Sequence, residues 1–125
     1  MALELSKKVL PDHIRINVSG DYSFTDLMKQ IEVVKMYAVE ANRDHIFIDA
    51  RSMNGRITES EKFFLGTQIA EVYGARIKVV SLMPEGCITK LGEMAAVNRG
   101  ARFLVTESKT EAMEWLLPSM ATVQS

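Results

Sequence analysis

Hydrophobic and polar side chains alternate along residues 13–19, HIRINVS, near the start of the chain. A two-residue period is typical of a strand with one buried face and one face in water. Residues 3–9 precede this segment, and the pair Pro11-Asp12 between the two favours a turn. The sequence therefore predicts a β-hairpin in this part of the chain.

Four longer segments carry hydrophobic residues three and four positions apart, which predicts amphipathic helices. They begin at about Ser23 or Thr25, Thr58, Ile88 and Ser108, and they end at about Asn42, Gly74, Arg99 and Pro118. Thr58 with Glu61, and Ser108 with Glu111, have the spacing of capping boxes, in which a hydroxyl and a carboxylate satisfy backbone amides at the helix start.

Three further strands are predicted between these helices, at residues 45–49, 76–82 and 102–106. The first of them, HIFID, is nearly continuously apolar, as expected for a strand covered on both faces. The element order is ββαβαβαβα, and its three strand–helix–strand units imply parallel strands joined by right-handed crossovers. We predict an α/β fold with a single mixed, mostly parallel five-stranded sheet and four helices, in which the first strand is antiparallel at an edge.

The composition is that of one globular domain. The chain has 125 residues, 47% of them hydrophobic and 25% charged. We expect the domain to span residues 1–117 and to be followed by a mobile tail at residues 118–125. The 15 basic and 16 acidic residues are interleaved with a formal net charge of −1, which argues against nucleic acid as a partner.

The cellular setting follows from two further features of the sequence. Cys87 is the single cysteine, so no internal disulfide can form, and the chain shows no signal peptide. No apolar run approaches the ~20 residues that span a bilayer. We expect a cytoplasmic protein without a membrane span.

Catalytic and metal-binding patterns are weak. His13 and His45 are far apart in the sequence, and one cysteine offers no paired thiol for a metal. Neither a Gly-x-Ser-x-Gly elbow nor a phosphate-binding glycine loop occurs. We expect no catalytic residues, no metal and no cofactor; an enzyme that uses Asp49 and Cys87 with an arginine clamp remains as an alternative.

Polar loops are expected where the central strands end, which is where α/β proteins usually bind ligands. They comprise residues 49–56, which include Arg51 and Arg56, and residues 84–87. Asp49 ends an apolar strand, so its charge requires hydrogen bonds. It either holds the loop through an Asx turn or helps to shape a recognition surface. The arginines and the helix-start amides suit an anion, whereas ordinary solvation of the loops is the alternative.

Methionine and phenylalanine residues at helical positions are expected to fill the core. The methionines are Met28, Met36, Met94 and Met113. Phe63 and Phe64 are adjacent and project about 100° apart on a helix, so one of them is expected at the rim, available to a partner or a second copy.

The phrases FLGTQIAEVYG, RIKVVSL and ITKLGEMAAVNRGARFLV, in this element order, resemble the SpoIIAA-like branch of the STAS domains, relatives of bacterial anti-sigma-factor antagonists. The similarity covers residues 3–117. In those antagonists a strand ends in aspartate, and an Asp-Ser-Ser-Gly-like box follows at the next helix start. A partner kinase phosphorylates one box serine and so switches partner binding off.

Asp49 matches the strand end of that pattern, whereas the box position reads Ile-Thr-Glu-Ser, residues 57–60, without the aspartate and the glycine. The resemblance makes Thr58 and Ser60 candidate phosphosites. A phosphate here would meet the like charge of neighbouring glutamates, so the alternative is that Thr58 serves only as a helix cap.

Together these features predict a non-enzymatic cytoplasmic regulatory domain that binds another protein, such as a kinase-like or anti-sigma regulator, and that is able to form a homodimer. The expected contact residues are Asp49, Arg51, Asn54, Arg56, Thr58 and Ser60. The alternative is a small-ligand or lipid carrier in which the methionine-rich helices line a pocket.

Overall fold

The computed structural model describes residues 2–84 and 90–118 of the chain. Its elements are β1 (Glu4–Val9), β2 (Ile14–Asp21), α1 (Phe24–Glu40), β3 (His45–Asn54), α2 (Glu59–Tyr73), β4 (Lys78–Leu82), α3 (Leu91–Val97), β5 (Arg102–Thr106) and α4 (Lys109–Leu116). The predicted order ββαβαβαβα is confirmed. Of the expected C-terminal tail, only Pro118 lies within the described residues.

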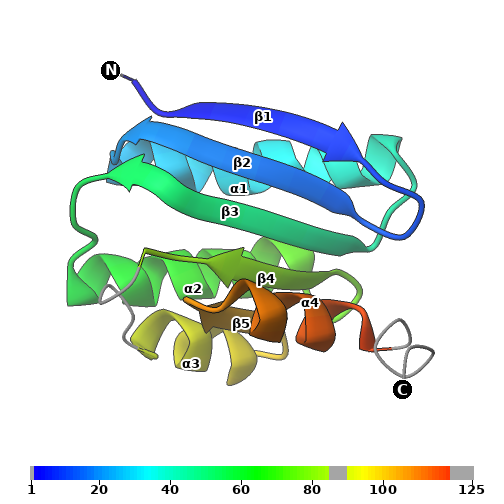
Figure 1. Cartoon of the computed structure of the whole chain (residues 1–125). Helices are drawn as coiled ribbons and strands as arrows, with labels where there is room; N and C mark the ends of the chain where they lie inside the picture. Colours follow the sequence, from blue (N-terminus) through cyan, green and yellow to red (C-terminus); the bar gives the residue numbers. More distant parts are fainter. Residues whose placement is uncertain (1, 85–89, 119–125) are drawn as a thin grey trace.

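The five strands form one sheet in their order along the chain. β1 pairs antiparallel with β2 at one edge, and the pairs β2–β3, β3–β4 and β4–β5 are parallel. Right-handed crossovers between strands that are laid down in this order all fall on one face, so α1, α2 and α3 share a layer. α4 follows the last strand and lies on the opposite face (Figure 1).

The alternation along β2 decides which side chains meet the three-helix layer. Ile14, Ile16 and Val18 are buried in the larger core, together with Ile31 of α1 and Leu65 of α2. Burial of such side chains stabilises the fold by about 1.5–3 kcal/mol each.

A second, smaller core lies under α4. Phe47, Val80 and Leu82 of the central strands pack there against Ala112 and Leu116, and all five side chains are fully buried. The central strands are therefore covered on both faces, as their apolar sequence predicts.

The helix starts follow the predicted local chemistry. Ser23 and Ser108 each accept a hydrogen bond from the backbone amide three residues further on, at 3.3 and 3.2 Å. Thr58 forms the complete capping box predicted with Glu61. The box predicted at Ser108 is only half formed, because the Ser108 backbone amide donates to the Thr106 hydroxyl at 3.1 Å. Asn42 has a φ of +56° just beyond α1, which is the left-handed stop expected of this residue.

The predicted end of the third strand at Asp49 is wrong, because β3 continues to Asn54. The extension is paired: Ser19 to Asp21 of β2 lie opposite Ser52 to Asn54, after an irregularity in the register between Asn17 and Ser19. Pairing with β2 therefore keeps in the sheet the polar residues that the sequence suggested would form a loop. β4 begins at Lys78 rather than at residue 76, and the described part of the third helix begins at Leu91.

The helices α2 and α3 approach closely through glycine. A Cβ atom on Gly66 would lie 2.2 Å from the carbonyl oxygen of Gly92, and a Cβ atom on Gly92 would lie 3.0 Å from that of Lys62. Side chains at these positions would push the helices apart, so the contact depends on glycine.

The exposed side of α2 and α3 carries large apolar side chains. Phe64 is 52% exposed. Phe63 is half-buried, with the guanidinium carbon of Arg99 5.1 Å from its ring centroid. One phenylalanine therefore lies at the rim, as predicted.

The expectation that the helical methionines fill the core is wrong for two of them. Met36 and Met94 are 59% and 56% exposed, because they lie on the outer sides of α1 and α3. Met28 and Met113 are half-buried. Among the residues that the structure describes, no helix is long and apolar enough to cross a bilayer.

Candidate functional site

An aspartate on β3 holds two arginine side chains on the α4 side of the sheet. Asp49 accepts hydrogen bonds from the side chain of Arg51 at 3.0 and 2.8 Å, and from the backbone amide of the same residue at 3.1 Å. A guanidinium nitrogen of Arg15 on β2 lies 3.3 Å from the carboxylate. The guanidinium carbon of Arg15 is 5.0 Å from the centroid of the Phe47 ring, which fixes its position on the sheet.

This arrangement keeps Asp49 ionised. The hydrogen bond from Arg51 is the main reason why the pKa of the Asp49 carboxyl lies below its ordinary value, and the charge of Arg15 acts in the same direction. Only 13% of the side chain is exposed, whereas that of Arg51 is 47% exposed. A carboxylate paired in this way is a weak proton acceptor at neutral pH, so the geometry suits positioning and recognition better than acid–base chemistry.

The start of α2 is organised around the Thr58 hydroxyl. Its oxygen accepts from the backbone amide of Glu61 at 3.3 Å, and the hydroxyl donates to the Glu61 carboxylate at 3.0 Å. That carboxylate also accepts from the Thr58 backbone amide at 3.0 Å, which lowers the Glu61 pKa. The Ser60 hydroxyl lies 3.4 Å from that of Thr58, so both candidate phosphosites are exposed on one helix turn.

Tyr22 fixes the turn between β3 and α2. Its backbone amide donates to the carbonyl of Asn54 at 2.7 Å. Gly55 follows with a φ of +105°, and a Cβ atom there would lie 3.2 Å from that of Tyr22. The Tyr22 hydroxyl is buried near the Glu61 carboxylate without a partner in good hydrogen-bonding geometry. Burial, followed by the charge of Glu61, raises the pKa of this hydroxyl.

Four of the six predicted contact residues form two separate groups rather than one: Asp49 with Arg51, and Thr58 with Ser60. The contacts of Asp49 are with the two arginines on the sheet, and those of Thr58 are within the first turn of α2. The five residue-to-residue steps of strand from Asp49 to Asn54 span about 16 Å. Asn54 and Arg56 are exposed and lie between the groups along the chain. Of the second predicted loop, residues 85–87, including Cys87, lie outside the described residues.

Comparison with solved structures shows which known fold this architecture resembles. The chain matches the solved structure of the anti-sigma factor antagonist SpoIIAA in its unphosphorylated form, with a TM-score of 0.54 and 12% sequence identity. The match covers 90% of this chain and 94% of the other. The protein has a SpoIIAA-like fold. No protein-family model matches the sequence, and no curated protein matches it either.

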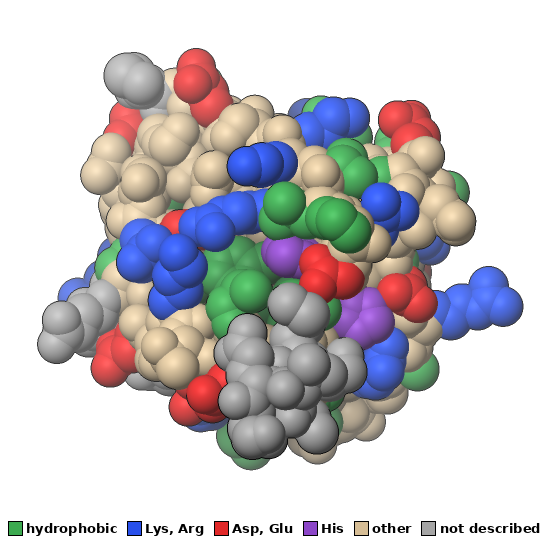
Figure 2. Space-filling model, turned by 45° about the vertical axis from the view of Figure 1, so that its right-hand side comes forward, with side chains coloured by type: hydrophobic (Ala, Val, Ile, Leu, Met, Phe, Trp, Pro, Cys, Tyr) green, Lys and Arg blue, Asp and Glu red, His purple; other side chains and the backbone are tan. Residues whose placement is uncertain are grey.

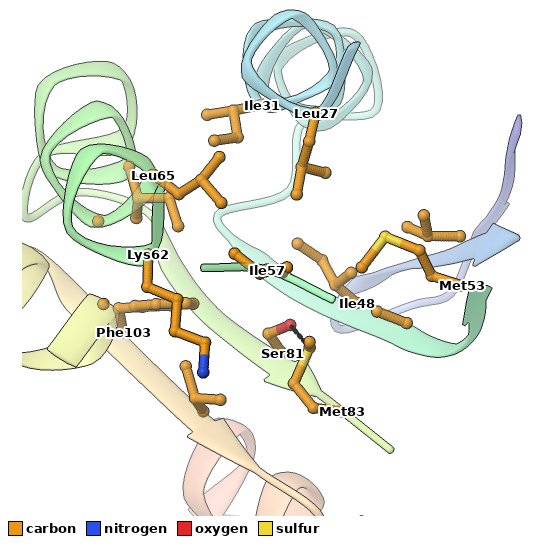
Figure 3. Close-up of a pocket in the computed structure, with 16 residues that line it drawn as sticks. Leu27, Ile31, Ile48, Met53, Ile57, Lys62, Leu65, Ser81, Met83 and Phe103 are labelled. Atoms are coloured by element: carbon orange, nitrogen blue, oxygen red, sulfur yellow. Dashed lines mark hydrogen bonds between the residues drawn. The ribbon is translucent and has the colours of Figure 1, made fainter. Parts of the chain in front are cut away.

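The protein also contains a cavity whose position was not predicted from the sequence. It has a volume of about 120 Å³ and lies between the sheet and the layer formed by α1, α2 and α3 (Figure 3). The walls formed by the described residues are almost entirely apolar, and Lys62 and Ser81 are the polar side chains among them. Ala50 and the two glycines of the α2–α3 contact also line it.

The cavity corrects the expectation that methionines on helices would line a pocket. Its methionines are Met53 on β3 and Met83 just after β4. The sequence did hold a signal for this cavity, namely the small residues Ala50 on β3 and Ser81 on β4 at inward positions. Only the register of β3 against β4, in which Ile48 pairs with Ser81, shows that these two positions are neighbours.

Proposed function

We propose that this protein is a non-enzymatic regulatory domain that binds another protein through the surface formed by residues 51–60, here called the α2 entry surface. The observation that carries this proposal is the SpoIIAA-like fold over 90% of the chain, since SpoIIAA is an anti-sigma factor antagonist. The partner that fits best is a regulator of the kind that such antagonists bind.

The exposure of the α2 entry surface supports the proposal. Arg51, Asn54, Arg56 and Ser60 are exposed, and the capping box gives the helix start a defined shape without any partner. A preformed surface binds with a smaller loss of conformational entropy than a mobile one.

The α2 entry surface carries charges of both signs. This favours a specific partner over any molecule that is attracted only by a surface charge of one sign. Two basic side chains, Arg51 and Arg56, are followed by the carboxylates of Glu59 and, just beyond this stretch, Glu61. Elsewhere on the molecule, the face shown in Figure 2, which carries the two histidines, also has basic and acidic side chains interspersed. A surface with charges of both signs sets register and excludes wrong partners more than it adds affinity.

Ser60 is the better of the two candidate phosphosites. The Thr58 hydroxyl is engaged in the capping box in both directions, so its modification would break the cap. Ser60 lies in the first turn of α2, where the helix dipole favours a phosphate, although the neighbouring glutamates oppose it. Phosphate on Ser60 would place about −2 charge in the middle of the α2 entry surface.

Affinity capture from a lysate of the source organism tests the proposal. The informative variant is Arg56→Glu/Ser60→Glu, which reverses charge on the α2 entry surface and leaves Thr58 and the cap in place. Lys109→Glu/Thr110→Glu is the matched control, because it makes the same changes at the exposed start of α4.

The expected result is a protein retained by the wild type and by the α4 control, and lost from the α2 variant. Equal retention by both variants would show that the α2 entry surface is not the contact. Mass spectrometry of the chain isolated from cells would locate any phosphate on Ser60 or Thr58.

A further inference from the structure

The outer edge of β1 is a surface that fits a second copy of this chain. We propose that β1 pairs antiparallel with the β1 strand of a second copy, about a twofold axis at Ser6, so that the two sheets join into one. The inference rests on the backbone and the charges of β1. It is independent of the protein partner proposed for the α2 entry surface.

The two edges of the sheet differ in what occupies their outer backbone groups. On β5, the amide of Val105 donates to the carboxylate of Glu93 at 2.8 Å, and its carbonyl accepts from the ammonium group of Lys90 at 2.6 Å. β1 lies along the opposite edge, and Figure 1 shows no described helix or strand beyond it. An exposed strand edge is a template for pairing with another chain. The β1 edge is therefore the one that is available to a partner strand.

The ladder between β1 and β2 shows which backbone groups of β1 point outward. The amide of Leu10 donates to the carbonyl of His13 at 2.9 Å, and the antiparallel register continues from this pair. Backbone groups alternate in direction along a strand, so the even-numbered residues of β1 bond to β2. Leu5, Lys7 and Val9 point their amides and carbonyls outward. A second copy can therefore complete its hydrogen bonds only where odd-numbered residues lie opposite one another.

The charges of β1 select one of these registers. With Leu5 opposite Lys7 of the second copy, Ser6 lies opposite Ser6, and Glu4 lies opposite Lys8 twice by symmetry. A shift of two residues in one direction would oppose the two Lys7 side chains, and a shift in the other would separate Glu4 from Lys8. Opposite charges on facing residues stabilise a strand pair, whereas like charges destabilise it. The strand is thus complementary to itself in the register centred on Ser6.

Lysine on an edge strand usually discourages pairing, and β1 carries two lysines. The ammonium group of Lys7 is 4.2 Å from the centroid of the Tyr37 ring, so this side chain lies over α1 of its own copy. Lys8 lies opposite Arg15 within its own sheet, where it meets a like charge. Glu4 and Lys8 are both exposed on the other face of β1. Pairing of two copies would therefore give each Lys8 the acidic neighbour that its own sheet does not supply.

Sedimentation velocity of the purified full chain tests this pairing. The interface is small, so a reversible dimer is expected whose fraction rises with protein concentration. Glu4→Lys and Lys8→Glu each oppose like charges twice and should raise the dimer Kd at least about tenfold. The double variant Glu4→Lys/Lys8→Glu restores both pairs and should return the Kd to within about threefold of wild type. Lys109→Glu and Glu114→Lys make the same exchanges at exposed positions of α4 and should leave the Kd unchanged.

Disulfide cross-linking tests the register. In a chain that carries Cys87→Ser, the substitution Ser6→Cys would place the thiols of two copies opposite each other, with Cα atoms about 4.5 Å apart and within the range of a disulfide. Val9→Cys is the matched control on the same strand, because two thiols there would lie about 20 Å apart. Mild oxidation should convert the Ser6→Cys chain, but not the Val9→Cys chain, to a covalent dimer.

Three results would overturn the proposal. They are a wild-type chain that stays monomeric up to about 1 mM, a wild-type Kd in both single charge variants, and cross-linking of Val9→Cys as readily as Ser6→Cys. The concentration series uses the wild-type chain, so it remains decisive even where a variant fails to fold.

Discussion

Gly66→Ala tests the close contact between α2 and α3. The added methyl group would lie 2.2 Å from the backbone oxygen of Gly92 and 3.0 Å from the Cβ atom of Ala95. Ordinary contacts of this kind begin at 3.4 Å, so α2 and α3 must separate by about 1 Å to accept it. The obstacle is backbone, which cannot rotate away as a side chain can.

Two opposing terms set the size of the effect. Alanine is a better helix former than glycine by about 1 kcal/mol, which alone would stabilise the variant. Overpacking of a filled contact costs about 1–3 kcal/mol, and a clash with backbone falls toward the upper end of that range. The expected net loss in free energy of unfolding is therefore about 1–2 kcal/mol, or a fall in Tm of roughly 4–8 °C.

Urea unfolding followed by circular dichroism measures this loss directly. Gly92→Ala is the matched comparison, because its methyl group would lie 3.0 Å from the backbone oxygen of Lys62 and needs a much smaller shift. It should be clearly less destabilising than Gly66→Ala. A Gly66→Ala variant as stable as the wild type would mean that helix propensity dominates and that the two helices are not in this contact.

Three further substitutions probe single interactions by the same unfolding assay. Thr58→Ala should cost about 1 kcal/mol through loss of the α2 cap, whereas Thr110→Ala, exposed in the first turn of α4, should stay within about 0.5 kcal/mol of wild type. Tyr73→Phe should cost about 1 kcal/mol, because the buried hydroxyl donates to the carbonyl of Ile31 at 2.8 Å; no change would contradict this bond. Asp49→Asn should cost about 1–2 kcal/mol near neutral pH. The pKa of Asp49 is lowered in the folded protein, so the extra stability of the wild type over Asp49→Asn is present above the ordinary pKa of 3.8 and is lost as pH falls through the lowered pKa. A difference in free energy of unfolding that stays constant with pH would refute the pairing.

The sequence predicted those features of the fold that depend on local chemistry. The hydroxyl caps at Ser23, Thr58 and Ser108 and the stop at Asn42 depend on residues within a few positions, and all four were predicted correctly; of the two predicted capping boxes, only that of Thr58 and Glu61 is complete. The order of strands along the sheet also follows from consecutive crossovers.

Strand length was not predictable in the same way. Residues 50–54 are polar or small and resemble a loop, yet they continue β3 because the end of β2 supplies hydrogen-bonding partners. The partner strand ends at Asp21, two residues beyond its own predicted end. Where two neighbouring strands extend together, neither sequence alone shows where they stop.

The contacts of Asp49 illustrate the same limit at the candidate site. The sequence indicated a charged residue in need of partners, and Arg51 is a local one. Arg15 is 34 positions away, and only the register of β2 against β3 brings it to the carboxylate. The alternation along residues 13–19 places Arg15 on the polar face, which is the signal that was available.

The division of the predicted contact residues into two groups leads to a test that separates stability from recognition. Asp49 is held by two guanidinium groups and little exposed, so its loss should affect unfolding more than partner capture. Arg56 and Ser60 are exposed, and charge reversal there should affect capture more than unfolding. If Asp49→Asn instead abolished capture with the free energy of unfolding intact, the arginine cluster on the sheet, and not the start of α2, would be the recognition surface.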